Sequence, residues 1–398
     1  MFLEITISII FGCLLGVITG LTPGVHINLI AALISTNLTN LLDHTTKLNL
    51  VVLIVSMSIT HIFLDIIPSI FLGIPSEDSA VIILPAHKLI LEGKAHEAII
   101  LTLLGTISST ILILSLVPTL IFIIPKIYLF IKNYIIFVLI IAATFLITKE
   151  KNRFDVLIVF LLSGVLGVVV LNLPNIKEPL LPLLSGLFGL SSLILSIKNN
   201  TKIPEQKIEK IKIEFKKLKF VILGTISGLI SAFLPGLGSS QTSVLSTSFL
   251  NKIDKKDYLI LNSSINAVNI IGSFITLYSI NKSRSGVAAT ISKILGKLKL
   301  LDLLLIISII MIVTFIATLL TIFFSKIFSK IINKVNYKKL CFFIITSNII
   351  LVLFVSKYVG LMVLVTSTSL GIYAQLKEVN KNQLMGCLLL PVILYFLL

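Results

Sequence analysis

The sequence predicts an all-α polytopic membrane protein of two inverted-topology repeats, each with a Pro-Gly-broken helical hairpin plus further transmembrane helices. Three observations predict this fold: the composition, a series of long uncharged segments, and a pair of matched helix breaks. Hydrophobic residues make up 56% of the 398 residues and charged residues only 13%, and the mean hydropathy is +1.11. A soluble domain carries roughly 25% charged residues. We therefore expect a multi-pass protein of the cell (plasma) membrane.

The second observation is the length of the segments that contain no Asp, Glu, Lys or Arg. A bilayer core of about 30 Å needs roughly 20 apolar residues in a helix. Twelve such segments occur, and ten of them have a length suited to one crossing. The other two, 5–42 and 220–251, are too long for one span and too short for two full spans with a turn.

Each of these two exceptional segments carries a Pro-Gly pair near its middle, at Pro23-Gly24 and at Pro235-Gly236. Proline removes a backbone donor and glycine permits positive φ, so a helix is expected to break there. We expect each segment to form a broken hairpin, in which two short helices are joined by an unwound turn at membrane depth.

The two exceptional segments also match one another. Four residues recur at a single displacement of 212 positions: Gly12, Gly16, Pro23 and Gly24 as Gly224, Gly228, Pro235 and Gly236. This match predicts a first transmembrane repeat at 1–197 and a second at 220–398, joined by a basic linker at 198–219.

The charge of the linker gives an orientation. It contains eight Lys and three Glu, which marks it as cytoplasmic, and a plain basic loop is favoured over an amphipathic helix at the membrane surface. Counting spans outward from the linker makes the first hairpin open outward and the second inward, which is an inverted repeat. The stretch Lys282–Lys299 carries five basic residues and would lie outside or re-enter the membrane.

Inverted repeats with helices broken near the midplane are typical of secondary transporters. Unwound turns leave backbone N–H and C=O groups free, and the N-termini of half-helices present partial positive charge. Irregular backbone is tolerated at membrane depth where it lines a cavity. We therefore expect substrate and coupling ion to meet at the two Pro-Gly turns.

Candidate substrate-binding residues lie in and after the helix breaks. Hydroxyl and amide groups at the start of a helix suit an anion such as a carboxylate or a phosphate, although Ser and Thr there also act as helix caps. The candidates are Thr22, Pro23, Gly24, His26, Asn28, Gly73, Pro75, Ser76, Pro235, Gly236, Gly238, Ser239, Ser240, Gln241 and Arg284. Arg284 is suited to bind a carboxylate or phosphate through two nitrogens, or it is a positioning charge at the membrane surface.

Candidate ion-coupling residues are ionisable or amide side chains within apolar segments: His61, Asp65, Asp78, Asn266 and Asn269. His61 and Asp65 stand four apart on one helix face. This spacing is consistent with a proton relay, with a cation site or with a mutually satisfied pair that packs the helices. Asn262, Asn266 and Asn269 form a polar stripe that we expect to face a cavity or another helix. An ionisable residue in a membrane segment is a functional hypothesis by default; the alternative for His26 is a neutral ring bonded to backbone.

Several function classes are excluded. The basic residues lie in short loops between apolar segments, so the net charge of +16 does not indicate nucleic acid. The sequence contains no phosphate-binding G-x-x-x-x-G-K-[ST] motif and no arrangement for nucleophilic catalysis, so we predict neither an ATP-driven pump nor an enzyme. His26, His61 and Asp65 are too scattered for a transition-metal site. No cofactor is expected beyond Na⁺ or H⁺ as the coupling ion.

The motifs resemble a known family. Gly16–Asn28 (GVITGLTPGVHIN), Gly73–Ser79 and Gly93–Ala98 resemble the TctA family, the large permease subunit of tripartite tricarboxylate transporters, and Gly228–Ser240 is similar to its second Pro-Gly motif. Within the family the chain looks like the shorter archaeal branch once labelled a domain of unknown function. By order of motifs, the similarity covers essentially the whole chain.

The resemblance implies a permease that carries carboxylates with a cation gradient, together with a small membrane subunit and an extracellular solute-binding protein. It also implies that Pro23-Gly24, Gly73–Pro75 and Pro235–Gly238 line the transport path. The chain departs from the bacterial pattern at Val25-His26, where that pattern tends to Leu-Gly, and at Ser76–Asp78, where it continues with small residues.

The predicted function is a secondary active permease for a small organic carboxylate, coupled to Na⁺ or H⁺, with the substrate held at the two Pro-Gly turns. The alternative is a translocase for polyprenyl phosphate or a related lipid phosphate. Another Pro-Gly-repeat membrane family associated with polyprenyl phosphate has motifs similar in kind, and a hydroxyl-rich turn with Arg284 suits a phosphate head group. A membrane enzyme acting on lipid would need a catalytic cluster that the sequence does not show.

Overall fold

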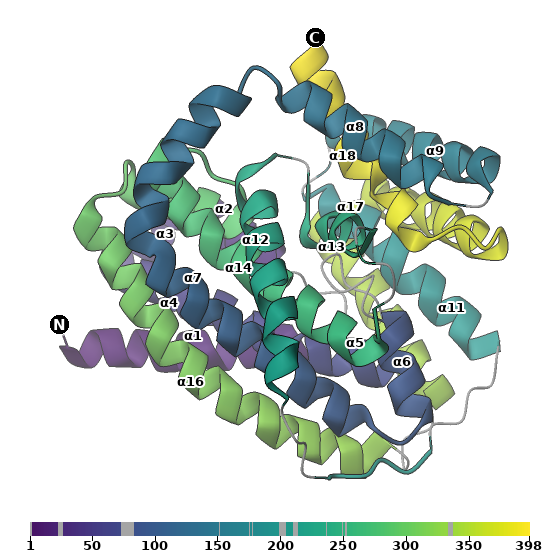
Figure 1. Ribbon diagram of the computed structural model, residues 1–398, viewed down its shortest axis with the longest axis horizontal. Coiled ribbons are helices and arrows are strands. Elements are labelled where there is room, and N and C mark those ends of the chain that lie inside the picture. Colours follow the sequence, from purple (N-terminus) through teal and green to yellow (C-terminus); the bar gives the residue numbers. More distant parts are fainter. Residues whose placement is uncertain are drawn as a thin grey trace.

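In the computed structural model, the described residues form helices joined by loops, with no strand among them (Figure 1). The described residues are 2–22, 27–72, 83–150, 152–174, 176, 178–198, 204–209, 214–235, 237–248, 250, 253–332 and 337–398. Several predicted site residues lie outside them: Pro23, Gly24, His26, Gly73, Pro75, Ser76, Asp78 and Gly236.

The helices follow one another with short connections. Those of the first half are α1 (Phe2–Leu21), α2 (Ile27–Thr36), α3 (Leu38–His44), α4 (Lys47–Leu64), α5 (Ile66–Leu72), α6 (Ile83–Leu91), α7 (Ala95–Ile131), α8 (Ile135–Thr148), α9 (Arg153–Leu171), α10 (Leu180–Leu184), the π-helix η1 (Ser185–Leu190) and α11 (Ser191–Lys198). Those of the second half are the 3₁₀-helix η2 (Phe215–Lys217), α12 (Leu218–Phe233), α13 (Ser239–Ser248), α14 (Lys255–Ile280), α15 (Gly286–Leu295), α16 (Leu300–Ile331), α17 (Tyr337–Leu376), the 3₁₀-helix η4 (Lys381–Met385) and α18 (Gly386–Leu397).

Seven helices of the described residues are long and apolar enough to cross a membrane: Phe2–Leu21, Lys47–Phe71, Ala95–Ile131, Arg153–Leu171, Lys255–Ile280, Leu300–Ile331 and Lys338–Leu376. The protein is therefore a multi-pass membrane protein. Two of these spans, Lys47–Phe71 and Lys255–Ile280, are 89% and 94% buried inside the protein. They are the central helices, and they carry the polar residues His61, Asp65 and the Asn stripe.

Three of the ten uncharged segments with a length suited to one crossing contain helices shorter than the seven long spans. Ile135–Thr148, Leu180–Leu195 and Lys381–Leu397 form apolar helices of at most 17 residues, and a helix rises only about 1.5 Å per residue. Within α17, two helices meet at Lys357, whose backbone is not helical (φ 54, ψ −155).

The second predicted helix break lies within the described residues. α12 ends at Phe233, Leu234 is extended (φ −83, ψ 127), Pro235 lies in the turn, and α13 begins at Ser239. In the first segment α1 ends at Leu21 and α2 begins at Ile27. The helices that follow the breaks, α2 and α13, have 10 residues each, but α1 has 20. Only the arms that follow the breaks are therefore much shorter than a full span.

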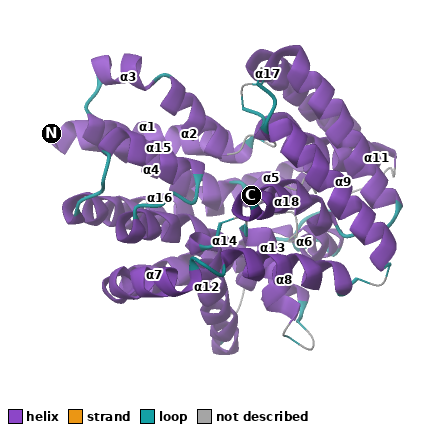
Figure 2. Cartoon of the chain, turned by 90° about the horizontal axis from the view of Figure 1, so that it is seen from above, coloured by secondary structure: helices purple, strands orange, loops and turns teal. Residues whose placement is uncertain are grey.

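The helices form two bundles, each built from both halves of the chain (Figures 1 and 2). The first bundle contains α1, α4, α7, α12, α14 and α16 around the largest apolar core. The second bundle contains α8, α9, α10, η1, α11, α17 and α18 around smaller cores. One of these smaller cores includes Leu234 and Leu237, so the second helix break lies where the two bundles meet.

The glycines that recur in the sequence pack two helix pairs in the same way. An ideal Cβ on Gly12 would lie 2.6 Å from Ser56 Cβ on α4, and one on Gly224 would lie 2.6 Å from Ser264 Cβ on α14. Gly16 meets Thr60 and Gly228 meets Val268 at similar distances. Without side chains at these glycines the helix backbones approach closely, which is how membrane helices commonly associate.

In the second bundle, helices of the first half of the chain pack against helices of the second half. α9 of the first half packs against α18 of the second, and α17 of the second half packs against α10 and η1 of the first. In the first contact Ser163 Oγ lies 3.3 Å from the carbonyl oxygen of Gln383, and in the second Ser367 Oγ donates to the carbonyl of Pro182 at 3.0 Å. Helices of the two halves therefore pack directly on one another in the second bundle.

The described part of the linker, 204–209, is not helical and lies against the turn between α6 and α7. The Lys207 N–H donates to Gly93 O at 2.8 Å, and the Gln206 side chain accepts from Ala95 N at 2.9 Å. Its amide nitrogen donates to Ile90 O at 3.1 Å. The linker is thus held against the end of the first bundle.

Candidate functional site

A cavity of about 180 Å³ lies where the first bundle meets α18. The residues that line it are Ile27, Asn28, Ser231, Leu234, Pro235, Leu237, Gly238, Asn269, Ile270, Arg284, Ser285, Val287 and Leu388. Five of the candidates from the sequence are among them: Asn28, Pro235, Gly238, Asn269 and Arg284. The cavity thus gathers the segments that follow both Pro-Gly pairs, together with α14 and the loop before α15.

Three helices begin at this cavity. Ile27 is the first residue of α2, Gly238 directly precedes α13, and Ser285 is the N-cap of α15. The Ser285 hydroxyl accepts from Ala288 N at 3.1 Å, as a capping side chain does. The N-terminus of a helix carries partial positive charge and unpaired N–H groups. Three such ends at one cavity favour an anionic ligand.

Asn28 and Gly286 join two of these helix starts. The backbone N–H of Gly286 donates to Asn28 Oδ1 at 2.9 Å, and deeper in the contact Thr290 Oγ1 donates to Ala31 O at 2.9 Å. These bonds hold α2 against α15, although α2 follows the first Pro-Gly pair and α15 belongs to the second half of the chain. The sequence identified Asn28 but not Gly286, because nothing local indicates a partner 258 positions away.

Arg284 is the one charged residue among the described residues that line the cavity. Its Nε is buried without a hydrogen-bond partner, and the guanidinium carbon lies 5.9 Å from the ring centroid of Tyr128 on α7. Tyr128 holds the guanidinium by cation–π attraction and by a side-chain hydrogen bond, while Nε stays available to a ligand. Arg284 therefore supplies a positive charge suited to a carboxylate or a phosphate.

The hydroxyl-rich start of α13 closes one side of the cavity and does not line it. Ser239, Ser240 and Gln241 are at most 1% exposed. Gln241 Oε1 accepts from Gly238 N at 2.9 Å, while Gln241 Nε2 is buried and has no partner. Thr22 lies apart from the cavity, and its hydroxyl donates to Ile18 O at 2.6 Å. The polar residues of this turn therefore cap and position the helix start.

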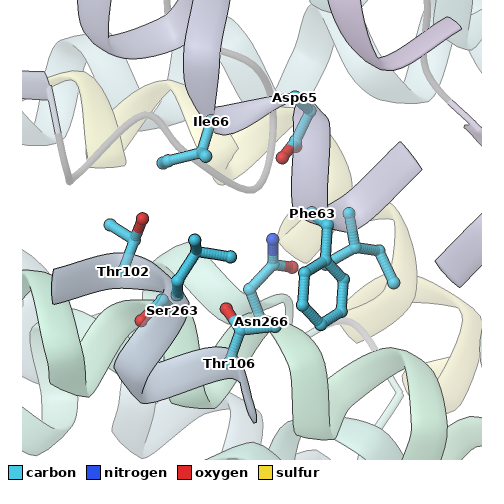
Figure 3. A pocket seen from close by; sticks show the side chains of 9 residues that line it. Phe63, Asp65, Ile66, Thr102, Thr106, Ser263 and Asn266 are labelled. Carbon is cyan, nitrogen blue, oxygen red and sulfur yellow. The ribbon is translucent and has the colours of Figure 1, made fainter. Parts of the chain in front are cut away.

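A second, much smaller pocket lies between the α4–α5 junction, α7 and α14 (Figure 3). Its volume is about 10 Å³, and it is lined by Ile62, Phe63, Asp65, Ile66, Thr102, Leu103, Thr106, Ser263 and Asn266. This is about the space that one water molecule occupies. The pocket brings together two ion-coupling candidates, Asp65 and Asn266, which lie in opposite halves of the chain.

The structure divides the remaining ion-coupling candidates. Asn269 lines the larger cavity. His61 is 5% exposed, and its Nδ1 lies 3.0 Å from Thr19 Oγ1 on α1, outside both sets of lining residues. The sequence reasoning missed Thr102, Thr106 and Ser263. Thr102 and Thr106 stand four apart in an apolar helix, and this spacing was a usable signal for one polar face.

Among the described residues, no group of His, Cys, Asp or Glu is arranged to hold a metal ion through three such ligands. The free cysteines Cys13, Cys341 and Cys387 are buried. They pack as small apolar side chains, as their apolar surroundings in the sequence indicate.

The comparisons with known proteins decide the family. The profile of the tripartite tricarboxylate transporter TctA family matches residues 7–386. The chain belongs to the TctA family. An uncharacterized protein of Methanocaldococcus jannaschii is 33% identical over 398 residues, which cover 98% of each chain. No solved structure matches significantly.

TctA proteins are the large membrane subunits of tripartite transporters. This TctA chain is accordingly a permease of the tricarboxylate-transporter type, and its seven long apolar helices agree with that membership. The family is one of transporters, which agrees with the prediction that the chain is not an enzyme.

Proposed function

We propose that the protein is a secondary active transporter that carries a small organic carboxylate across the plasma membrane, coupled to a gradient of Na⁺ or H⁺. The substrate binds in the 180 Å³ cavity. One observation carries the proposal: the starts of α2, α13 and α15 and the guanidinium of Arg284 converge on a cavity in which no described lining residue is acidic.

This arrangement supports an anion through several independent contributions. Helix N-termini offer N–H donors and partial positive charge, and arginine binds a carboxylate through two parallel hydrogen bonds. Asn28 and Asn269 add amide side chains from α2 and α14. Drug-sized ligands occupy pockets of roughly 300–1,000 Å³, so a cavity of about 180 Å³ suits a small anion. The polyprenyl-phosphate alternative gains no support from the family match.

We further propose that the two halves are inverted repeats. The packing of Gly12 on Ser56 and of Gly224 on Ser264 supports the duplication. In the second bundle, a Cβ on Gly186 would collide with Ser367 Oγ, and one on Gly386 would lie 2.7 Å from Ser163 Oγ. In each half a glycine thus lies against a serine of the opposite half.

A pseudo-two-fold relation between the two repeats also explains why helices from both halves of the chain pack together in the first bundle. α7 packs against α14, and α16 packs against α4. At the first contact Ser264 Oγ donates to Gly105 O at 3.1 Å, and at the second Thr321 Oγ1 donates to Phe63 O at 3.1 Å. Repeats related in this way are the usual frame for alternating access, in which one part moves against the other around a fixed site.

The family also supplies the proposed partners. We expect a small membrane subunit beside this chain and an extracellular solute-binding protein that delivers the carboxylate. Coupling ion and carboxylate would then bind near one another in the first bundle, at residues drawn from both repeats.

A ligand panel tests the proposed function. Purified protein is heated with succinate, citrate and other di- and tricarboxylates, and separately with polyprenyl phosphate. We expect a carboxylate to raise Tm in the wild type and in Lys282→Gln, an exposed neighbour that does not line the cavity, but not in Arg284→Gln. Stabilisation by polyprenyl phosphate alone contradicts the proposal.

A further inference from the structure

We propose that the pocket between Asp65 and Asn266 is a sodium site, built from oxygen atoms of both halves of the chain. The inference rests on the proposed transport function for the role of the ion, but the binding of the ion can be measured without any substrate. The site includes Thr102, Thr106 and Ser263, which the sequence did not suggest.

Three segments supply the oxygen atoms (Figure 3). Asp65 is the residue between α4 and α5. Thr102 and Thr106 stand one turn apart on α7, and Ser263 and Asn266 stand three residues apart on α14. All five side chains line one small pocket, so a ligand there would contact helices that are far apart in sequence.

The hydroxyl groups in the pocket are placed to accept. Thr102 Oγ1 donates its hydrogen to Ile99 O at 2.8 Å, and Ser263 Oγ donates to Ile260 O at 3.1 Å. A hydroxyl carries one hydrogen and two lone pairs. Because both hydroxyl hydrogens are bonded to backbone carbonyls, only the lone pairs of the two oxygens are available to a ligand in the pocket. A ligand that accepts hydrogen bonds therefore finds no donor in these two groups.

Asn266 and Asp65 complete the acceptor set. Asn266 is 9% exposed, and its Oδ1 has no hydrogen-bond partner. A buried amide oxygen without a partner is costly, since it has lost its hydration without compensation. An ionised Asp65 carboxylate is an acceptor only. A cation bound by these oxygens would supply the partner that Asn266 Oδ1 lacks.

Charge and size favour sodium over other cations. The described lining residues contain one carboxylate and no basic group, and one carboxylate does not balance a divalent ion, whose excess positive charge would be costly at membrane depth. Oxygen ligands suit hard cations, and transition metals prefer imidazole or sulfur. A pocket of about 10 Å³ holds one dehydrated small ion, and K⁺ is larger than Na⁺.

The position of the pocket links it to the substrate cavity. Asn266 lines the small pocket and Asn269 lines the large cavity. They stand three residues apart on α14, which is about 4.5 Å along the helix axis. An ion that fixes this part of α14 would therefore also fix Asn269 for the carboxylate. Ordering of the second site by the first ligand is a form of positive cooperativity.

Sodium binding is tested without substrate. The Tm of purified protein is measured in NaCl, KCl and choline chloride at equal ionic strength and pH, and ²²Na⁺ binding is measured at equilibrium. We expect a sodium-specific rise in Tm, because a ligand that binds only the folded state stabilises it. Thr102→Val, which removes one oxygen and keeps the shape of the side chain, should weaken Na⁺ binding by about tenfold or more.

Thr110→Val is the matched control. Thr110 lies on the same helix, is 1% exposed against 2% for Thr102, and also donates to a backbone carbonyl, that of Thr106, at 2.7 Å. It does not line the pocket. We expect Thr110→Val to bind Na⁺ as the wild type does and Asp65→Asn to lose binding. Thr102→Val keeps the test decisive if Asp65→Asn fails to fold.

Wild-type sodium affinity in both Thr102→Val and Asp65→Asn would overturn the inference, as would stabilisation of the wild type that follows pH and not Na⁺. The two proposals fail separately. If Na⁺ stabilises the protein through this pocket and no carboxylate does, the sodium site is retained and the substrate class is lost. If a carboxylate binds with no dependence on Na⁺, the sodium site is lost and the carboxylate cavity is retained.

Discussion

Asn28 Oδ1 accepts the backbone N–H of Gly286 at 2.9 Å, and this bond joins the first turn of α2 to the first turn of α15. The two residues are 258 positions apart and lie in opposite halves of the chain. Because the bond brings two helix N-termini together beside Arg284, it sets the positive end of the larger cavity. The site therefore exists only in the folded arrangement of both halves.

Asn28→Ala should weaken carboxylate binding. The substitution leaves the Gly286 N–H without its acceptor, which costs about 1–3 kcal/mol for a buried group, and it removes an amide from the cavity wall. We expect the carboxylate Kd to rise about tenfold, measured by titration of the purified protein. Asn37→Ala at the end of α2 is the control, because that side chain is exposed and bonds to Leu33 O. An equal effect of both changes would show that only the stability of α2 matters.

Gly16→Ala and Gly228→Ala should each lower Tm. A Cβ on Gly16 would lie 2.6 Å from Thr60 Cβ, and one on Gly228 would lie 2.7 Å from Val268 Cβ. Overpacking of this kind costs about 1–3 kcal/mol. Thermal unfolding in detergent measures the effect. Gly189→Ala serves as the comparison, since nothing lies within 4 Å of a Cβ there, and a loss of Tm in that variant alone would contradict the proposed duplication of helix packing.

Two ion pairs join the start of α14 to the first half of the chain: Lys255 with Glu92, and Lys256 with Glu97. Ion pairs near the surface are weak, and their attraction depends on the presence of opposite charges and not on which residue carries which charge. The double exchange Glu97→Lys with Lys256→Glu should therefore recover most of the stability that either single change loses. Unfolding of the four variants forms a double-mutant cycle, and additive losses in the double variant would show that the pair does not interact.

The Lys255–Glu92 pair should also respond to acid. The hydrogen bond from Lys255 is the largest cause that lowers the pKa of Glu92 below its ordinary value of 4.5. A carboxyl with a depressed pKa in the folded state contributes stability above its ordinary pKa and loses it as pH falls through the folded value. We expect the difference in Tm between wild type and Glu92→Gln to shrink and disappear as pH falls through the lowered pKa of Glu92. A difference that persists at low pH would assign the effect to packing.

The local chemistry of the fold was accessible from the sequence. The Pro-Gly pair and the uncharged segment around it predicted the break between α12 and α13, because proline and glycine act on the backbone where they stand. The 212-residue displacement of Gly12 and Gly224 pointed to matching helix contacts. Asn28, Gly238 and Arg284 were candidates because polar groups after a helix break have a recognisable pattern.

The long-range arrangement was not accessible. No local signal tells that α9 packs against α18, or that α7 packs against α14, since such pairings depend on how both halves fold around one another. The proposed sodium pocket also depends on long-range packing that the sequence does not predict. Thr102 and Ser263 are unremarkable hydroxyl residues in apolar helices, and their common role depends on a contact between segments 161 positions apart.

Transport by the purified chain tests the central claim most directly. The protein is reconstituted into liposomes, and uptake of labelled succinate and citrate is measured with an inward Na⁺ gradient, with an inward H⁺ gradient and with neither, for wild type, Arg284→Gln and Lys282→Gln. We expect the wild type and Lys282→Gln to accumulate a carboxylate only when a cation gradient is present, and Arg284→Gln to accumulate none. Equal accumulation in Arg284→Gln and wild type, or accumulation by the wild type without any cation gradient, would contradict the account.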